Sequence, residues 1–567
     1  MPEIHNPLVN ELQSIVGHPY VLTDHAKTRP YSTGFRLGAG NAMAVVRPTS
    51  LLEIWQALKA CNKADVAIIM QAANTGLTGG STPNGDDYDR PIVIINTMRI
   101  DQIQLIDNAK QIIGFAGSTL FGLEDTLKPY GREPHSVIGS SCIGASIVGG
   151  ICNNSGGALV QRGPAYTELS LFAQVDSDGE LSLVNNLGIQ LGDSPEAILT
   201  NLQDQNYSES DIKYGGKLAS DHEYHKRVRD IDSETPSRYN NDGRRLHEAS
   251  GCAGKLAVFA VRIDTYPKAL KEQVFYVGTN DPDVMTKIRR DILSTFKHLP
   301  VSGEYYDDAC YDVSKKYGKD TFLVINKLGS KYIPKLFAMK RVVDRLSERL
   351  SFLPSKFSDH VMQWGSYLWP NHLPKRMEEY RRKYRLHFII ETNNDGVEEA
   401  ETYLKEIFKD AEGDFFACTD DEADKAILHR FAIGGAIGRY HTIHSKENGS
   451  IMTIDVALRR NEKEWLEALP DHIEEKLAKK FYYGHFFCHV MHQNYIMKKG
   501  ADAKEVKAQI LAMLDKRGAE YPAEHNVGHE YAAKKDLKAF YRKCDPSNTF
   551  NPGIGKTSKL RDWGNCD

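Results

Sequence analysis

The first hundred residues alternate between short apolar runs and one amphipathic segment. Residues 42–48 and 66–73 are rich in apolar and β-branched side chains, as is typical of buried strands, and residues 50–64 repeat apolar side chains at helical spacing behind Ser50. Another apolar run at 91–98 follows a glycine-containing loop. This order of strands around one helix predicts an α/β unit.

The same scheme continues for another thirty or so residues and then breaks. Residues 111–117 predict a strand, and residues 119–131 predict a helix with Gly131 at its C-terminal end. Residues 204–245 are polar and dense in charge, and we expect them to form an insertion with little core. A strand pattern returns at 255–267, which places the first domain boundary near residue 267.

The composition excludes several classes of protein. The chain of 567 residues is 41% hydrophobic and 26% charged, as in ordinary globular proteins, and its length suggests more than one domain. It has no run of 18 apolar residues and no signal-peptide pattern at its start, so we expect it to stay in the cytoplasm. Nine cysteines without a CxxC pair favour reduced thiols, and a net charge of −4 argues against a nucleic-acid binder.

Two glycine-rich segments are the first candidates for ligand binding. QAANTGLTGGS, residues 71–81, directly follows a predicted strand, and a longer run of small residues occupies 139–163. Glycine lets the main chain approach a pyrophosphate closely and adopt positive φ. An ordinary turn and tight packing of small residues are the alternatives. Two such segments in one α/β unit favour two sides of one large ligand.

Histidines gather late in the chain. His485, His489 and His492 lie close together in sequence, and His525 and His529 follow Glu524. Imidazoles near a carboxylate suit a general base, a metal site or both, and hydrogen-bonded structural histidines are the alternative. On a helix His485 and His489 share a face, and on a single strand they lie opposite His492.

Two further patterns concern anions and surfaces. Arg430 and Arg439 offer forked guanidinium groups for a substrate carboxylate, with a surface salt bridge as the alternative. Residues 327–385 carry fourteen Lys or Arg against five Asp or Glu, together with aromatic residues such as Trp364 and Trp369. This combination favours contact with an anionic membrane surface over a solvated charged face or a nucleic-acid site.

The longer motifs resemble a known family. QAANTGLTGGSTPNG, GREPHSVIGSSCIGASIVGGICNNSGG, YYGHFFCH, YPAEHNVGH and DPSNTFNPGIGKTSK are similar, in order and spacing, to the bacterial quinone-dependent D-lactate dehydrogenases, flavoenzymes of the vanillyl-alcohol oxidase and p-cresol methylhydroxylase fold. The resemblance covers nearly the whole chain. It implies an α+β protein with a split FAD-binding domain, residues 1–267 and 516–567. An α+β cap or substrate domain, residues 268–515, is interrupted by a basic membrane-contacting segment at about 310–385.

The resemblance also implies the cofactor and its contacts. FAD is expected to bind without a covalent link. The contacts carried over by motif are Ala72, Ala73, Asn74, Thr75, Gly76, Gly80, Ser81, Gly139, Ser146, Gly156 and Val258.

The wider group of 2-hydroxy-acid flavoenzymes shares GHxGDGNxH and EHGxG elements at the substrate. Here GHFFCHVMH and EHNVG keep His485, His492, Glu524 and His525 in place but lack the GDGN core, and we therefore predict no metal. Our hypothesis is that Arg430 binds the substrate carboxylate and that His525 takes the hydroxyl proton.

The implied activity is that of a respiratory oxidoreductase. It oxidises D-lactate to pyruvate and passes the electrons through FAD to membrane quinone. The resemblance implies a peripheral protein of electron transport on the cytoplasmic face of the inner membrane, in contact with anionic lipid and not with nucleic acid. A flavin dehydrogenase or oxidase for another 2-hydroxy acid, such as glycolate or 2-hydroxyglutarate, is the alternative.

Overall fold

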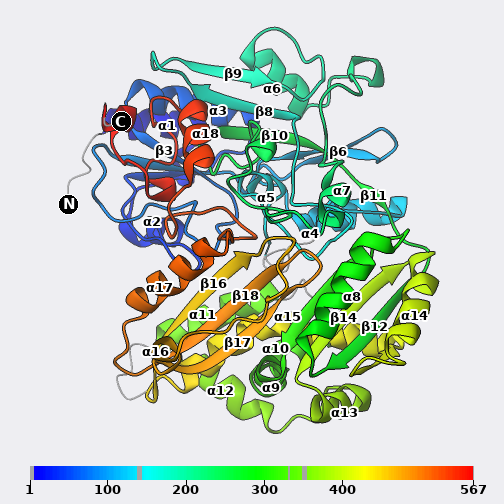
Figure 1. Cartoon of the computed structure of the whole chain (residues 1–567). Helices are drawn as coiled ribbons and strands as arrows, with labels where there is room; N and C mark the ends of the chain where they lie inside the picture. The colour runs from blue at the N-terminus through cyan, green and yellow to red at the C-terminus, as the bar shows by residue number, and fades with distance from the viewer. Residues whose placement is uncertain (1–5, 137–143, 330–332, 348–353, 355, 566–567) are drawn as a thin grey trace.

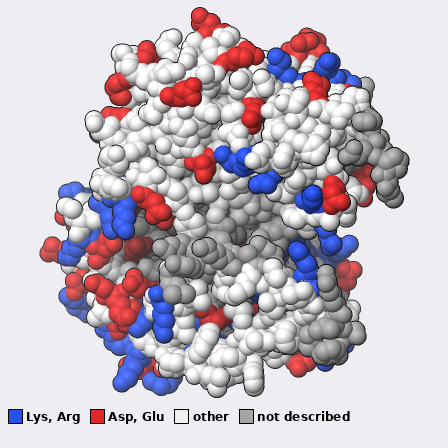
Figure 2. Space-filling model, turned by 180° about the vertical axis from the view of Figure 1, so that it is seen from behind, with Lys and Arg blue, Asp and Glu red and all other residues white. Residues whose placement is uncertain are grey.

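Three main sheets organise the chain. The structure is a computed structural model that describes residues 6–136, 144–329, 333–347, 354 and 356–565 (Figure 1). A four-stranded and a five-stranded sheet lie in the upper half of the view, and a seven-stranded sheet fills the lower half. Seen from behind, the surface is hollowed between the two halves, and charged side chains border the hollow (Figure 2).

The first sheet is the predicted α/β unit. Its order is β1 (Val21–Leu22), β2 (Ala44–Val46), β4 (Ile92–Asn96) and β3 (Ala67–Gln71), and β2, β4 and β3 run parallel. Helix α3 (Leu51–Lys63) makes the crossover between β2 and β3. It begins as predicted at Ser50, whose hydroxyl accepts a hydrogen bond from the Glu53 N–H over 3.1 Å.

The second sheet is antiparallel and continues the same half. Its order is β5 (Ile103–Ile106), β6 (Gln111–Phe115), β10 (Ala257–Asp264), β8 (Ser170–Val175) and β9 (Leu181–Asn185). The chain returns to this half at its C-terminal end, where Phe550 forms a parallel bridge with Ile68 of β3. Phe550 is fully buried in the same hydrophobic core as Ile68. Other helices here are α1 (Pro7–Val16), α4 (Leu120–Leu127), α5 (Ile147–Cys152), α6 (Pro195–Gln203) and α18 (Lys535–Cys544).

The third sheet is antiparallel and carries helices on both faces. Its order is β15 (Asp414–Ala417), β12 (Glu272–Thr279), β14 (Leu386–Asn393), β13 (Ser302–Asp307), β17 (Leu477–His485), β18 (Val490–Lys498) and β16 (Asn448–Ala457). One face packs on α8 (Pro282–Thr295), α14 (Gly396–Ile407) and α17 (Ala503–Lys516), and the other on α9 (Asp308–Tyr317), α13 (Lys375–Lys383) and α15 (Asp420–Ile443).

The polar insertion at 204–245 has more core than we expected from its composition. Its helix α7 (Tyr224–Arg229) buries Tyr224 and Val228 completely in the largest hydrophobic core. The expectation of little core is therefore wrong. The charged residues there bind one another, as Arg227 binds Asp221, so the segment packs inward despite its high charge.

The basic segment forms a group of helices at the bottom of Figure 1. They are α9, α10 (Lys319–Leu328), α11 (Ile333–Ser347), α12 (Phe357–Ser366) and α13. Large apolar side chains lie open to solvent here, with Trp364 78% and Leu368 85% exposed. Several of the basic side chains are paired internally, such as Lys340 with Asp359. In the described part of the chain, no helix combines the length and apolar character needed to span a bilayer.

Candidate active site

A tight hairpin brings two of the late histidines together. β17 ends on His485, and β18 carries His492 back past it, so the two rings meet edge to face with centroids 5.2 Å apart. This stretch forms neither of the two arrangements considered from the sequence, a helix and a single strand, so both predictions are wrong. Phe486 and His489 close a turn instead, with His489 in the left-handed region at φ 55°.

The strand register supplies each histidine with a carboxylate. Glu304 on β13 lies directly opposite His485, and Asp455 on β16 lies directly opposite His492. The side chains of residues directly opposite each other on neighbouring strands point to the same face of the sheet, with Cβ atoms about 5 Å apart. Glu304 Oε1 is 2.6 Å from His485 Nδ1, and Asp455 Oδ1 is 2.6 Å from His492 Nδ1. The antiparallel pairing alone therefore creates two carboxylate–histidine pairs.

Glu524 enters this cluster from the C-terminal part of the chain. Its carboxylate lies 3.0 Å from His485 Nε2 and 3.6 Å from His492 Nε2. Arg238, from the polar insertion, donates to Glu524 over 2.7 Å and to the Gly157 carbonyl over 2.8 Å. The cluster is thus assembled from parts that are far apart in sequence.

His525 joins the cluster through Asp455. Its Nε2 lies 3.0 Å from Asp455 Oδ2, and its Nδ1 lies 3.4 Å from the Asn526 carbonyl oxygen, which is long for a hydrogen bond. His525 therefore faces one carboxylate, whereas His485 and His492 each face two. Nδ1 of His525 is the least committed ring nitrogen of these three side chains.

Arg430 lies at the other end of the cluster. Helix α15 places its guanidinium 2.7 Å from Glu304 Oε2 and over the ring of Tyr483, 4.6 Å from the centroid. Glu304 therefore lies between the cations of Arg430 and His485. Glu304 and His485 lie on the face of the third sheet that α15 covers.

Paired carboxylates raise the pKa of two of these imidazoles, His485 and His525. Burial alone lowers the pKa of His485, but Glu304 and Glu524 raise it to about 10. Burial also lowers the pKa of His525, but its hydrogen bond and charge interaction with Asp455 outweigh burial and raise it. Burial raises the pKa of Glu304, yet Arg430 and His485 hold it below its ordinary value. The buried imidazolium of His485 is suited to stabilise negative charge that develops on a substrate oxygen.

Three of these residues also have the composition of a metal site. One ligand atom each from His485, His492 and Glu524 lies within 4.8 Å of the other two. In the geometry described above, both nitrogens of each ring face a carboxylate oxygen, so the cluster is satisfied by its own ion pairs. The prediction that no metal is used stays a prediction.

The two glycine-rich segments predicted to hold FAD lie side by side next to the cluster. A Cβ built on Gly80 in the first segment would lie 3.6 Å from Asn153 Oδ1 in the second. The Thr78 hydroxyl donates to the Asn526 carbonyl over 3.0 Å. The first loop is therefore bonded directly to the residue that follows His525.

These loops leave room for a cofactor. A Cβ at Gly76 would meet no atom of the described residues within 4 Å, whereas a Cβ at Gly156 would lie 2.6 Å from Arg238 Nη1. Open space beside main-chain N–H groups is what a pyrophosphate needs. Of the other predicted contacts, Ser146 caps α5, Val258 is buried in β10, and Gly139 lies outside the described residues.

Comparisons with known proteins match both halves of this arrangement. A family model described as "FAD binding domain" matches residues 42–183, and one described as "D-lactate dehydrogenase, membrane binding" matches residues 274–563. The quinone-dependent D-lactate dehydrogenase of Escherichia coli K12 is 56% identical over 98% of this chain and 97% of its own. That of Haemophilus influenzae is also 56% identical, over 98% of this chain and 99% of its own. The chain belongs to the quinone-dependent D-lactate dehydrogenase family.

A solved structure supports the fold of this chain. A p-cresol methylhydroxylase with substrate bound is similar with a TM-score of 0.56 and 14% identity, over 98% of each chain. At this identity the likeness is one of fold. It confirms the predicted fold class, an α+β chain with an FAD-binding domain of the vanillyl-alcohol oxidase and p-cresol methylhydroxylase type.

The residues predicted as catalytic lie in one cluster, and their roles stay predictions. Sequence reasoning missed Glu304, Asp455 and Arg238, because no motif marks them. A lone carboxylate in an apolar strand was the available signal for Asp455. Three residues that the sequence suggested as candidates lie outside the cluster. Arg439 forms ion pairs with Asp320 and Asp359. His489 and His529 form hydrogen bonds with the carbonyls of Arg459 and Thr82, respectively.

Proposed function

We propose that the protein oxidises D-lactate to pyruvate with FAD and passes the electrons to a quinone. The full-length relatives carry that activity in their name. The observation that carries the proposal is the hydrogen bond from Thr78 to Asn526, since it puts the cationic cluster beside the FAD loops. We do not propose glycolate or 2-hydroxyglutarate as the substrate, because the full-length relatives are named for D-lactate.

The chain's own contribution to the chemistry begins with a base. When bound, FAD accepts the hydride from the carbinol carbon of D-lactate and delivers the electrons to quinone. We propose that His525, in its neutral form, takes the hydroxyl proton at Nδ1 while its Nε2–H donates to Asp455, because one carboxylate fixes the ring and balances the charge it gains. General-base assistance of this kind is worth about 10²- to 10⁴-fold in rate.

His485 acts as a fixed positive charge in this proposal. It faces Glu304 and Glu524, which raise its pKa and favour the protonated form. It stabilises the substrate oxygen as its proton leaves, with no reorganisation of the site. Glu524 is the shared counterion that sets the positions of the His485 and His492 rings, and Arg238 fixes Glu524.

Arg430 stays our assignment for the group that binds the substrate carboxylate. Glu304 occupies one amino group of its guanidinium. We propose that the carboxylate of D-lactate binds the edge that Glu304 leaves available. An arginine presents several donors in a fixed plane, so it can hold both carboxylates at once.

The FAD contacts and the domain boundaries remain part of the proposal. We propose that residues 1–267 and 516–567 bind FAD and that residues 268–515 form the cap over the substrate. The return of Phe550 to β3 supports a split FAD domain. The proposed contacts, all described except Gly139, are those at Ala72–Gly76, Gly80, Ser81, Gly139, Ser146, Gly156 and Val258.

We further propose that the basic segment at about 310–385 contacts anionic lipid on the cytoplasmic face of the inner membrane. A membrane-binding family model covers this segment. Its exposed apolar side chains suit the interfacial region of a bilayer, and its Lys and Arg suit anionic head groups. Met339, Val342, Leu346, Val361, Trp364, Tyr367 and Leu368 make up this apolar patch, here called the α11–α12 patch.

A substrate and acceptor panel tests the proposed function. D-lactate, L-lactate, glycolate and D-2-hydroxyglutarate are each offered with a soluble quinone analogue, with cytochrome c or with oxygen. We expect D-lactate with the quinone analogue to give by far the highest kcat/KM. Faster turnover of another 2-hydroxy acid, or of D-lactate with oxygen, contradicts the proposal.

A further inference from the structure

A second pocket adjoins the cluster. It encloses about 450 Å³ of empty space, including its opening to solvent, between the polar insertion and the stretch from Pro164 to Tyr166. Ala523, the neighbour of Glu524 in sequence, forms part of its wall. Among the described residues, no predicted FAD contact lines this pocket. Asn154 of the second glycine-rich segment also lines the pocket, which therefore adjoins that segment as well as the residues that hold Glu524.

Arginines dominate the charge of its wall. Arg227, Arg238 and Arg245 line the pocket, against the carboxylates of Asp221 and Asp242. Asp221 is shared, since both Arg227 and Arg245 pair with it. The wall therefore carries three guanidinium groups against two carboxylates.

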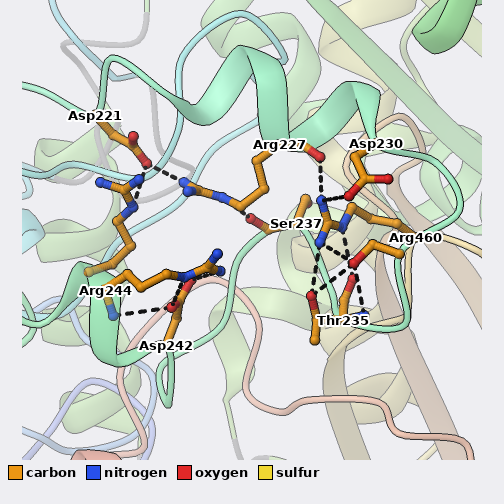
Figure 3. Close-up of polar contacts among 10 residues, drawn as sticks. Asp221, Arg227, Asp230, Thr235, Ser237, Asp242, Arg244 and Arg460 are labelled. Carbon is orange, nitrogen blue, oxygen red and sulfur yellow. Dashed lines mark hydrogen bonds and ion pairs between the residues drawn. The ribbon is translucent and has the colours of Figure 1, made fainter.

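The second carboxylate is already neutralised from outside the pocket. Figure 3 shows Arg244 folded onto Asp242, with two hydrogen bonds of 2.7 Å, and Arg227 reaching Asp221. Arg244 is not among the residues that line the pocket, and its side chain is 61% exposed. Since Arg238 pairs with Glu524 and Asp242 with Arg244, Arg227 and Arg245 share Asp221, and an excess of one positive charge remains at the wall.

One guanidinium group in the pocket wall has a hydrogen-bond donor left unpaired in the described part of the chain. The Nε of Arg238 is buried and has no hydrogen-bond partner among the described residues. Its side chain is 3% exposed, and its two amino groups bind Glu524 and the Gly157 carbonyl. An unpaired donor on a buried cation is costly unless a ligand or water occupies the site.

The pocket is preformed by a rigid frame. Arg460, which follows β16, donates to the Arg227 carbonyl over 2.6 Å and to Thr235 over 2.9 Å (Figure 3). Arg245 lies over the ring of Tyr166, 5.6 Å from its centroid. These contacts hold the guanidinium groups in place before any ligand arrives, which lowers the entropic cost of binding.

We propose that this pocket binds a small carboxylate anion, and that the bound anion slows turnover by competing with Glu524 for Arg238. Guanidinium groups bind carboxylates through charge-assisted, often bidentate hydrogen bonds. An anion on Arg238 weakens its hold on Glu524, the counterion that positions His485 and His492. Because the anion binds outside the substrate site, its effect persists at saturating D-lactate.

Inhibition by acetate tests the proposal. Holoenzyme turnover is measured over a matrix of D-lactate and acetate concentrations at constant ionic strength. We expect a non-competitive component in the wild-type protein. In Arg245→Gln we expect the constant for that component to rise about tenfold or more, as fits the loss of one charge-assisted hydrogen bond, with kcat and KM for D-lactate unchanged. Arg244→Gln, a neighbouring arginine outside the pocket, is the matched control and should retain the wild-type pattern.

A direct binding measurement separates this proposal from the proposed function. Calorimetric titration of oxidised holoenzyme with acetate needs no turnover, and it should show a site that Arg245→Gln loses and Arg244→Gln keeps. Arg245→Lys, which retains the charge, takes the place of Arg245→Gln if the latter loses flavin, and should bind acetate more weakly than wild type. Purely competitive inhibition in the wild type, or a non-competitive component that is unchanged in the Arg245 variants, overturns the proposal.

Discussion

Asp455 Oδ2 lies 3.0 Å from His525 Nε2, while its other oxygen lies 2.6 Å from His492 Nδ1. A single carboxylate from the seven-stranded sheet therefore orients one histidine from the hairpin and one from the C-terminal part of the chain. This bridge makes the position of the proposed base depend on the packing of two segments that are distant in sequence.

Loss of this bridge should slow the chemical step. In Asp455→Asn and in His525→Gln we expect flavin reduction by D-lactate to fall about 10²- to 10⁴-fold, because the base is misoriented or absent. Stopped-flow absorbance measures this step directly. His489→Gln removes a buried histidine of the same hairpin outside the cluster, and should leave the rate near wild type once flavin content is matched. A wild-type rate in His525→Gln removes this residue as the base.

His485 should make stability depend on alkaline pH. Its pKa is about 10 in the folded protein, since Glu304 and Glu524 outweigh burial, and about 6.5 when unfolded. The linked stabilisation is fully present below about pH 6.5 and is lost as pH rises through about 10. The urea midpoint of the wild type should therefore fall more over this range than that of His485→Gln. Parallel curves for the two proteins would show that His485 is not held as a cation.

The second glycine-rich segment should be sensitive to side-chain size. A Cβ at Gly156 would lie 2.6 Å from Arg238 Nη1, so Gly156→Val must displace the arginine that holds Glu524, or shift the loop beside the flavin. We expect loss of FAD occupancy while the far-ultraviolet circular dichroism stays native. Gly435→Ala, at an exposed position of α15 where a Cβ meets nothing within 4 Å, is the control. A Gly156→Val protein that is fully occupied by FAD and active would show that the segment 139–163 serves packing rather than FAD binding.

The α11–α12 patch should decide membrane affinity. In Leu368→Glu we expect less protein to float with anionic liposomes, because a charge replaces an apolar side chain that is 85% exposed. Leu270→Glu, at a residue 98% exposed outside the patch, is the matched control. Turnover with a soluble quinone analogue should be unchanged in both. If flotation of the wild type depends neither on lipid charge nor on salt, the proposed electrostatic attraction between the basic segment and anionic lipid is contradicted.

Local patterns predicted the first sheet and strand β6 of the second sheet well. The helix after Ser50 and the strands at β2, β3, β4 and β6 follow from apolar periodicity and a capping residue, which act within one segment. The hairpin at His485 and His492 could not be predicted this way, because a turn of ordinary residues carries no Gly or Pro signal. Resemblance of motifs gave His485, His492, Glu524 and His525, but not the contacts between them.

The residues that hold the cluster together depend on long-range register. Glu304 and Asp455 become partners of histidines only because β13 pairs with β17 and β16 pairs with β18. Arg238 is a different case, since its charge-dense surroundings suggested a solvated insertion. Its role follows from buried ion pairs that composition cannot reveal.

The most direct test of the account is an anaerobic titration of the purified protein, followed by its flavin absorbance. D-lactate should bleach the oxidised flavin spectrum, and a quinone analogue added afterwards should restore it. L-lactate and NADH should leave the spectrum unchanged. A protein without flavin absorbance, or one whose flavin D-lactate does not reduce, contradicts the proposal that this cluster and these loops form an FAD-dependent D-lactate dehydrogenase.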